Sequence, residues 1–344
     1  MKNSVLVSLA HIATVIGAGF ASGAEVVSYF LIYGRASLFG VVLAGILFSA
    51  FSYLVMNGCF ENKTYDFLEY VRRIMPVFWQ RFTVGIFFLS MVVCLGAMSA
   101  AAGEILGDCF LVNKTYAAVA FSLVCGILLC FPVSYITKFN GALGGVIGVG
   151  IIFCCVYIMK FRFLETFNSM HKISLSALSY VAYNGMGASV LLCSMSKFLK
   201  TKKQIISAAL FNGIGITIIL ILLWCVVGIY YGKIDLGEIP MLVIAKRQGK
   251  VIFTVYAVLL FLAVFTTAVS NGYGVIELVK KTRFGNWAVM ITLTVMIILS
   301  KIGFFTIVNV VYRGCGYISL IFPIFMIINR VKLRNLKKNK DKQI

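Results

Sequence analysis

Two short stretches of this sequence combine glycines with polar side chains in a way that could bind a small solute. Residues 17–23 read Gly-Ala-Gly-Phe-Ala-Ser-Gly and are followed closely by a carboxylate, Glu25. Residues 183–189 read Tyr-Asn-Gly-Met-Gly-Ala-Ser. Both stretches lie inside long apolar runs, where a break in a helix would free backbone N–H and C=O groups as ligands. Close packing of helices through small residues is the alternative interpretation of both stretches.

The positions of the two stretches favour broken helices. Apolar runs occur at about 5–33, 37–58, 82–108, 116–134, 140–159, 174–195, 205–231, 251–279, 286–302 and 305–329. The glycine-rich stretches fall in the first and the sixth of these ten runs, which is the corresponding place in two halves of five. Paired interruptions of this kind are typical of transporters built from inverted repeats. The sequence therefore predicts that the first and sixth helices are broken.

A break leaves two half-helices whose facing ends differ in charge. The N-terminal end of the outer half offers N–H groups that suit a carboxylate, and the C-terminal end of the inner half offers carbonyl oxygens that suit a small cation. The predicted substrate-binding residues are Ala18, Gly19, Phe20, Ala21, Ser22, Tyr180, Tyr183, Asn184, Gly185 and Met186. Carbonyls near Ala13 and Ile16 are the candidate cation ligands.

Two adjacent hydroxyls in the eighth run, Thr266 and Thr267, could complete a cation site. Oxygen ligands that carry no full charge can build a site for sodium. In the alternative interpretation each hydroxyl bonds back to the carbonyl one turn earlier in its own helix. A broken first helix nearby favours the sodium site.

Ionisable residues inside apolar runs are costly in a bilayer and are therefore candidates for function. Glu104 and Glu277 fit the ends of their runs, whereas Glu25 and Arg313 lie several residues inside theirs. Glu25 and Arg313 each need a partner, and a charge pair between them would act as a gate or a strut.

The composition restricts the chain to one class of protein. Of its 344 residues 61% are hydrophobic and 12% are charged, with a mean hydropathy of +1.00. Soluble globular domains have about 45–50% apolar and about 25% charged residues. These values exclude a soluble enzyme, a disordered chain and a nucleic-acid-binding domain. We predict an all-α integral membrane protein with about ten transmembrane helices, since each crossing needs about 20 apolar residues.

The chain has room for one transmembrane domain over residues 1–329, with a first repeat at about 5–159 and a second at 174–329. Residues 330–344 form a basic tail. If the N-terminus is inside, the inside loops hold about twice as many Lys and Arg residues as the outside loops, which predicts that both termini are cytoplasmic in a cell membrane. This topology, rather than nucleic-acid binding, explains most of the net charge of +20.

Metalloprotease, P-loop and nucleophile-elbow motifs are absent from the sequence, so neither an enzyme nor a cofactor is expected.

The stretch of residues 17–25, near the start of a basic chain with ten apolar runs, resembles the YkvI family of bacterial membrane proteins. That family is placed in the amino acid–polyamine–organocation superfamily, which has the LeuT-type five-plus-five fold. The resemblance implies a sodium site made of two first-helix carbonyls, one eighth-helix carbonyl and the two hydroxyls of an Ala-x-x-Thr-Ser/Thr pattern. Ala263, Thr266 and Thr267 match the pattern, and alignment of the glycines puts the two first-helix carbonyls on Ala13 and Ile16. Sodium-coupled carriers of this fold often hold a substrate carboxylate with a third-helix Tyr, which residues 92–107 lack.

These observations predict a secondary active transporter of a small organic solute, such as an amino acid, that works by alternating access and is coupled to sodium. Its partners would be that solute and the lipid bilayer, with no nucleic acid. The alternative is a sensor or receptor subunit that binds a solute in the same fold without moving it, as spore-germination receptor subunits do.

Overall fold

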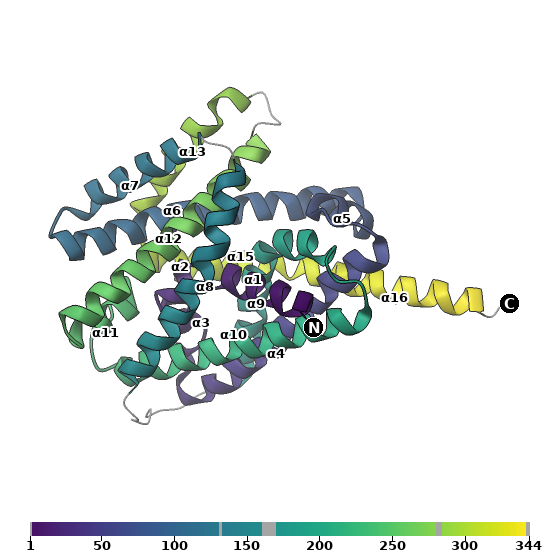
Figure 1. The fold of residues 1–344 in the computed structure, drawn as a ribbon, viewed down its shortest axis with the longest axis horizontal. Helices are drawn as coiled ribbons and strands as arrows, with labels where there is room; N and C mark the ends of the chain where they lie inside the picture. Colours follow the sequence, from purple (N-terminus) through teal and green to yellow (C-terminus); the bar gives the residue numbers. More distant parts are fainter. Residues whose placement is uncertain (1, 131–132, 160–169, 280–283, 342–344) are drawn as a thin grey trace.

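The chain folds into a bundle of helices (Figure 1). The computed structural model describes residues 2–130, 133–159, 170–279 and 284–341, and all the regular structure in these ranges is helical. The first apolar run forms α1 (Lys2–Val15), α2 (Ala18–Ala21), α3 (Ala24–Tyr29) and the 3-10 helical segment η1 (Leu31–Ala36). The second to fifth runs form α4 (Ser37–Asn62), α6 (Val77–Phe110), α7 (Lys114–Leu128) and α8 (Val133–Ile158).

The second half of the chain continues the same pattern. The sixth to ninth runs form α9 (Met170–Ser196), α10 (Lys202–Tyr230), α12 (Lys250–Val279) and, after the 3-10 turn η2 (Gly285–Trp287), α13 (Ala288–Ser300). The tenth run forms α14 (Phe304–Thr306), the π-helical segment η3 (Ile307–Tyr312), α15 (Arg313–Ser319) and α16 (Ile321–Asp341). Two further short helices are α5 (Phe67–Ile74), between α4 and α6, and α11 (Pro240–Arg247), between α10 and α12.

Several helices are long and apolar enough to cross a membrane. Among the described residues these are Ser37–Asn62, Val77–Phe110, Ile173–Ser196, Lys202–Tyr230, Lys250–Val279 and Phe304–Lys332. Shorter apolar helices of 10–17 residues are Asn3–Val15, Ala24–Gly34, Lys114–Leu128, Gly145–Ile158 and Gly285–Ser300. The prediction of an all-helical, multi-pass membrane protein is therefore confirmed over the described part of the chain.

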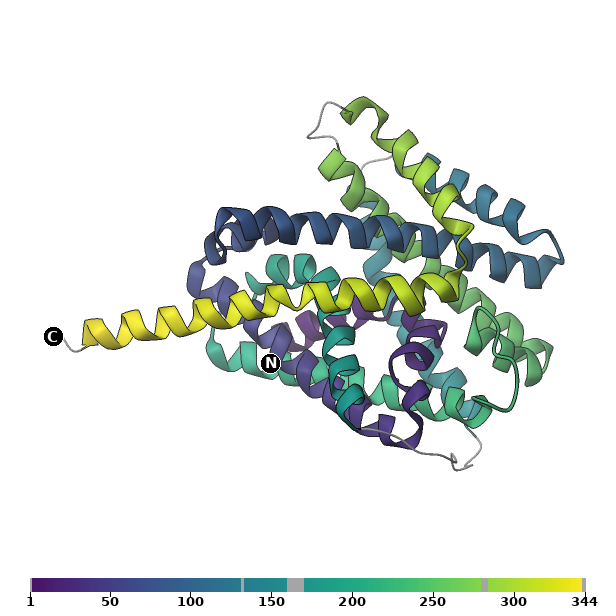
Figure 2. The same cartoon turned by 180° about the vertical axis from the view of Figure 1, so that it is seen from behind.

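Small residues bring the long helices close together. α4 packs along α9 and α10, and α6 packs along α7, α12 and α13. A Cβ atom on Gly213 of α10 would collide with Ser49 of α4, so this crossing requires a residue without a side chain. Such contacts are typical of helices that associate in lipid, where close approach replaces the hydrophobic effect. The C-terminal part of α16 extends out of the bundle as a single helix up to Asp341 (Figure 2).

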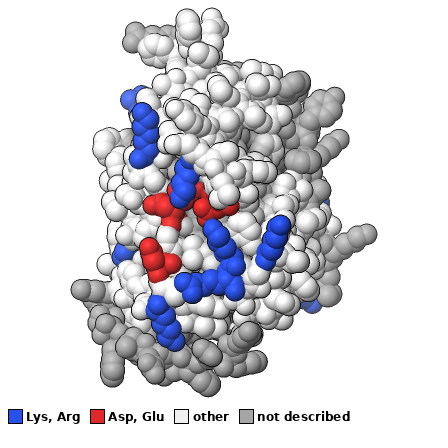
Figure 3. All heavy atoms as spheres, turned by 90° about the vertical axis from the view of Figure 1, so that its left-hand side faces the viewer, with Lys and Arg blue, Asp and Glu red and all other residues white. Residues whose placement is uncertain are grey.

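Charged side chains gather at the end of the molecule that lies opposite the C-terminal helix. On this face, Lys, Arg, Asp and Glu side chains cluster within a largely uncharged surface (Figure 3). The ion pair between Lys114 Nζ and Glu104 Oε2, 2.6 Å long, joins the start of α7 to α6. Glu104 therefore marks the end of its run, as its position in the sequence predicts.

The predicted break in the first apolar run is confirmed. α1 ends at Val15, α2 is only four residues long, and α3 begins at Ala24. Gly17 has an extended backbone (φ −80°, ψ −178°) that separates α1 from α2. Gly23 has a φ of +77°, a left-handed conformation that a side chain would strain, and it separates α2 from α3.

The predicted break in the sixth run is wrong, because α9 passes through that stretch as one continuous helix. Its polar side chains bond back within the helix: Ser189 Oγ donates to the Gly185 carbonyl at 2.7 Å, and Asn184 Nδ2 donates to the Tyr180 carbonyl at 3.3 Å. Gly185 serves close packing, since a Cβ atom there would lie 2.8 Å from the ring of Phe51 on α4. The packing alternative is therefore the correct interpretation of Gly185.

Candidate functional site

The first break leaves backbone groups without hydrogen bonds inside the protein. The N–H of Gly17 donates to the carbonyl of Val15 at 2.7 Å instead of reaching back a full turn to Ala13. No backbone N–H of another described residue donates to the carbonyls of Ala13 and Ile16. These two carbonyl oxygens are therefore available as cation ligands, at the positions that the sequence predicts.

The start of α2 offers the opposite polarity. No described carbonyl accepts a hydrogen bond from the N–H groups of Ala18, Gly19 or Phe20. All residues of α2 are buried, so these N–H groups are shielded from solvent by the surrounding helices. Freed donors and freed acceptors thus lie within a few residues of each other at one break.

The hydroxyl of Thr267 lies beside this break. Its Oγ1 is 3.5 Å from the position that a Cβ atom would take on Gly17, and α12 packs against α2. Thr266 Oγ1 instead donates back to the carbonyls of Leu262 and Ala263, at 3.0 Å and 3.1 Å. The structure therefore places the Thr267 hydroxyl beside Gly17, next in sequence to Ile16, while Thr266 adopts the alternative, back-bonded geometry.

The second break, between α2 and α3, is held by groups from other helices. The N–H of Met241 on α11 donates to the Ser22 carbonyl at 2.9 Å, and the Tyr256 hydroxyl on α12 donates to the Ala21 carbonyl at 2.5 Å. Ser22 Oγ accepts from the N–H of Ala24 at 3.1 Å and donates to the Gly19 carbonyl at 2.8 Å. The Ser22 hydroxyl therefore bridges the backbone of α2 and α3 across this break.

Glu25 is buried where α2, α3 and α9 meet. Its carboxyl fills the space that a Cβ atom on Gly19 would occupy, and Oε2 lies 3.5 Å from the Asn184 amide nitrogen. The close approach of Glu25 explains why residue 19 carries no side chain. A carboxyl and an amide from distant parts of the sequence thus meet beside the freed N–H groups of α2.

The predicted charge pair between Glu25 and Arg313 is not formed. The Arg313 guanidinium donates to the Tyr33 hydroxyl at 3.1 Å and lies 5.9 Å from the centre of the Tyr29 ring. Tyr29 in turn packs against Tyr180, with ring centres 5.1 Å apart. The arginine therefore finds an aromatic partner and a hydroxyl instead of a carboxylate.

The predicted substrate residues on α9 point in different directions. Tyr180 packs among Tyr29, Phe30 and Phe48, and Tyr183 stacks on Tyr312 of η3 with ring centres 4.4 Å apart. Met186 is buried, and Gly185 faces α4 rather than α2. Asn184 lies 3.5 Å from Glu25, and Tyr180 and Tyr183 of the same helix also face that carboxyl.

Three contributors were not predicted from the sequence: Met241, Tyr256 and Tyr312. Tyr256 lies about three turns before Thr267 on α12, so the two hydroxyls share one face of that helix. This spacing could have been recognised in the sequence. Nothing in the sequence marks the backbone of Met241, because any residue except proline could supply its N–H.

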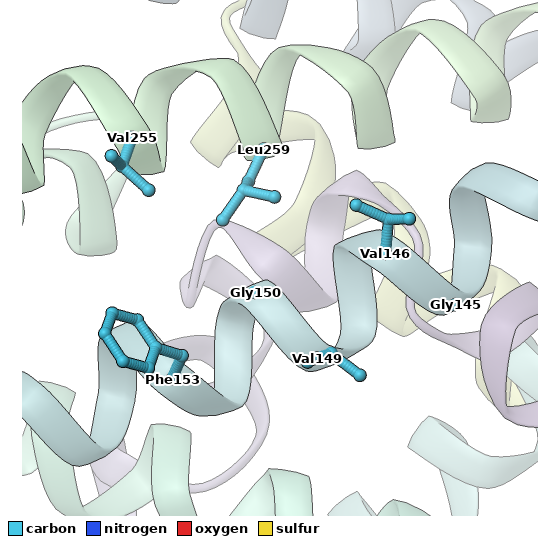
Figure 4. Close-up of a pocket in the computed structure, with 7 residues that line it drawn as sticks. All are labelled: Gly145, Val146, Val149, Gly150, Phe153, Val255 and Leu259. Atoms are coloured by element: carbon cyan, nitrogen blue, oxygen red, sulfur yellow. The ribbon is translucent and has the colours of Figure 1, made fainter.

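Two apolar hollows lie elsewhere on the surface. The larger, of about 570 Å³, lies between α8 and α12 and is lined by Val146, Phe153, Val255 and Leu259 among others (Figure 4). The other, of about 420 Å³, lies against α13. Neither includes a predicted substrate or sodium residue. The predicted substrate residues of α2 are instead packed and buried.

Comparison with known proteins gives two relatives of similar length. No protein-family model matches the chain. It is 27% identical over 340 residues to the uncharacterized membrane protein YkvI of Bacillus subtilis, covering 91% of this chain and 92% of that protein. It is 22% identical over 334 residues to the uncharacterized protein YyaD of the same organism, covering 92% of this chain and 94% of that protein. The resemblance to the YkvI family predicted from residues 17–25 is confirmed.

Two of the solved structures that are similar to this chain illustrate its fold. One is the substrate-bound, outward-open state of a Na⁺-coupled sialic acid symporter, with a TM-score of 0.57, 11% identity, and coverage of 93% of this chain and 74% of that chain. The other is a variant of the Eremococcus coleocola manganese transporter, with a TM-score of 0.51, 14% identity, and coverage of 96% and 72%. At such identities the likeness shows the fold alone.

Proposed function

We propose that this relative of YkvI is a secondary active transporter that moves a small organic solute, such as an amino acid, by alternating access. The observation that carries the proposal is the break between α1 and α2, which leaves carbonyls and N–H groups unbonded inside the protein. Unwound backbone at membrane depth lines substrate and ion sites in transporters. The fold shared with two solved transporters supports the same class.

The coupling ion in this proposal is sodium, held between α1 and α12. Its ligands are the carbonyls of Ala13, Ile16 and Ala263 and the hydroxyls of Thr266 and Thr267. The position of the Thr267 hydroxyl beside Gly17 supports this site. Thr266 donates its hydroxyl proton to the Leu262 and Ala263 carbonyls, and a hydroxyl that donates in this way can still offer its oxygen to a cation.

The substrate in this proposal lies between α2 and α9. A carboxylate accepts hydrogen bonds from the N–H groups of Ala18, Gly19 and Phe20, while Tyr180, Tyr183, Asn184 and Met186 shape the other side. Gly185 packs on Phe51 and does not line this site. Since the α2 residues are buried, the described structure is a closed state that must open for the solute to enter.

The architecture in this proposal is a five-plus-five inverted repeat. Each half contains a short amphipathic helix after its second apolar run, α5 in the first half and α11 in the second. This correspondence supports the repeat, although the halves differ at their first helices. Both termini are cytoplasmic in this proposal. An alkaline-phosphatase fusion after residue 344 tests this orientation, because the fused enzyme should be inactive in the cytoplasm.

Uptake of a labelled amino-acid mixture into proteoliposomes, with and without an inward sodium gradient, tests the function. We expect uptake to rise with the gradient, and Thr267→Ala to abolish the rise. The matched control is Thr254→Ala, because Thr254 lies on the same helix, is exposed, and only bonds back to Lys250. Equal uptake under both conditions contradicts sodium coupling, and binding without uptake favours the sensor alternative.

A further inference from the structure

Glu25 is a buried carboxyl group without a cation to pair with. It lies in the first turn of α3 and is only 3% exposed. In the part of the chain that the structure describes, no ion pair within 4.0 Å includes it. An ionised carboxylate buried without a partner is strongly unfavourable. Its charge must therefore be removed or balanced by something that the protein binds.

The groups that face Glu25 do not balance a negative charge. The Asn184 amide nitrogen, at 3.5 Å, is at the outer limit of a hydrogen bond. The titratable groups that face the carboxyl come from α3, α6, α9 and η3, and they are Tyr29, Cys94, Tyr180, Tyr183 and Tyr312. Phenols and thiols are ordinarily neutral at pH 7. Arg313, the cation next to these tyrosines, donates a hydrogen bond to the Tyr33 hydroxyl.

The packing around Glu25 leaves a proton as the ligand that fits. The carboxyl fills the space beside Gly19, and neither surface hollow reaches it. Within the described ranges, no group of three or more His, Cys, Asp and Glu side chains could hold a metal ion. A proton needs no cavity, and it removes the cost of burying the charge.

We propose that Glu25 is a proton-binding site and that proton exchange at this carboxyl is coupled to transport; this inference rests on the proposed function. In the closed state Glu25 carries the proton. When α2 and α3 separate from α9, water reaches the carboxyl, the O–H bond breaks, and the proton leaves to that side as hydronium while the carboxylate remains. A proton taken from water on the other side restores the neutral group.

The position of Glu25 explains how its protonation affects the conformation. The side chain belongs to α3, fills the space beside Gly19 of α2 and meets Asn184 of α9. Re-burying the carboxylate without a proton is unfavourable. Closure of the α2–α9 contact therefore requires proton uptake, which is the condition for coupling proton flow to the conformational cycle.

Infrared spectroscopy of the full chain in lipid nanodiscs tests the proton site without a substrate. At about pH 7 ordinary carboxyl groups are ionised. We expect the wild type to show the C=O band of a protonated carboxyl group that shifts in D₂O, and Glu25→Gln to lack it. The control is Glu277→Gln, which removes an exposed carboxylate and should keep the band. A band that survives in Glu25→Gln, or that is absent from the wild type, overturns the proposal.

Proteoliposomes test the coupling. An inside-alkaline pH gradient should accelerate uptake of an amino-acid mixture in wild type and in Glu277→Gln. In Glu25→Gln the acceleration should fall by about tenfold or more, within the usual range of coupling between two sites. Acceleration that persists in Glu25→Gln overturns coupling through this residue. Absence of any uptake in wild type overturns the transport proposal and the coupling, while the infrared band still decides whether Glu25 binds a proton.

Thermal unfolding measured at a series of pH values shows whether Glu25→Gln is still folded. The wild-type melting temperature should fall as pH rises, because the unfolded chain releases a proton that the folded chain retains. Glu25→Gln should be folded and less sensitive to pH. An equal pH dependence in both proteins contradicts a bound proton at Glu25.

Discussion

The first and sixth apolar runs carry similar glycine-rich stretches, yet the chain breaks in the first and continues as one helix in the sixth. In the first run, other helices supply partners for the backbone: Met241 donates to the Ser22 carbonyl, and Tyr256 donates to the Ala21 carbonyl. In α9, Ser189 bonds back to the Gly185 carbonyl of the same helix. The break between α2 and α3 is therefore stabilised by tertiary partners that take up the groups it frees.

Glycines in the two stretches also have different roles. Gly23 has a backbone conformation that a side chain would strain, and Gly19 makes room for a buried carboxyl. Gly185 makes room for an aromatic ring, and Gly187 faces open space. The glycine-rich motif alone therefore does not distinguish a broken helix from a continuous one. Replacing each glycine by alanine separates the roles of the individual glycines.

The largest effect is expected for Gly23→Ala. The left-handed backbone costs an L-residue about 1–2 kcal/mol. The new Cβ atom would also lie 3.0 Å from side-chain atoms of Met241 and Val227, which adds crowding in a packed core. Thermal unfolding of the purified protein should show a clear drop in melting temperature. An unchanged melting temperature contradicts the strained second break.

Gly19→Ala should cost about 1–3 kcal/mol, because its Cβ atom collides with the Glu25 carboxyl. The double variant Gly19→Ala/Glu25→Ala tests this cause, since shortening residue 25 removes the collision. Unfolding free energies of the two single variants and the double variant should show coupling of about 0.5–3 kcal/mol. Strict additivity contradicts a contact between these residues.

Tyr256→Phe should cost about 1–3 kcal/mol, because it leaves the buried Ala21 carbonyl without a donor. The matched control is Tyr273→Phe. Tyr273 lies on the same helix as Tyr256 but far from the break, and its hydroxyl donates to the Leu128 carbonyl. Hydrogen exchange measures the local effect: amides of α2 and α3 should exchange faster only in Tyr256→Phe. Equal exchange in both variants contradicts a role for Tyr256 in holding the break.

The smallest effect is expected for Gly187→Ala. Its Cβ atom would meet no atom within 4 Å, and alanine favours a helix by about 0.5–1 kcal/mol over glycine. We expect an unchanged or slightly raised melting temperature. Gly185→Ala, two residues away, should lower it because the Phe51 ring must move. A strong loss of stability in Gly187→Ala contradicts the continuous, one-sided packing of α9.

The sequence predicts those features that depend on composition and local pattern. The membrane class follows from hydropathy, and the break at residues 17–23 is predicted from glycines and polar groups inside an apolar run together with the position of that run. The continuity of α9, the back-bonded Thr266 and the pairing of Arg313 with Tyr33 depend on residues far away in the chain. No local spacing encodes those partners, because α9 and Phe51 of α4, or Arg313 and Tyr33, meet only after the bundle assembles.

The wide turns of η3 contain more residues than α-helical turns of the same length. Each residue of an α-helix rotates the chain by about 100° about the axis. Tightening Ile307–Tyr312 into α geometry would therefore turn Tyr312 off the face of Tyr183, with every backbone hydrogen bond exchanged rather than lost. The stacking of Tyr312 on Tyr183 therefore ties the π-helical geometry of η3 to the position of α9.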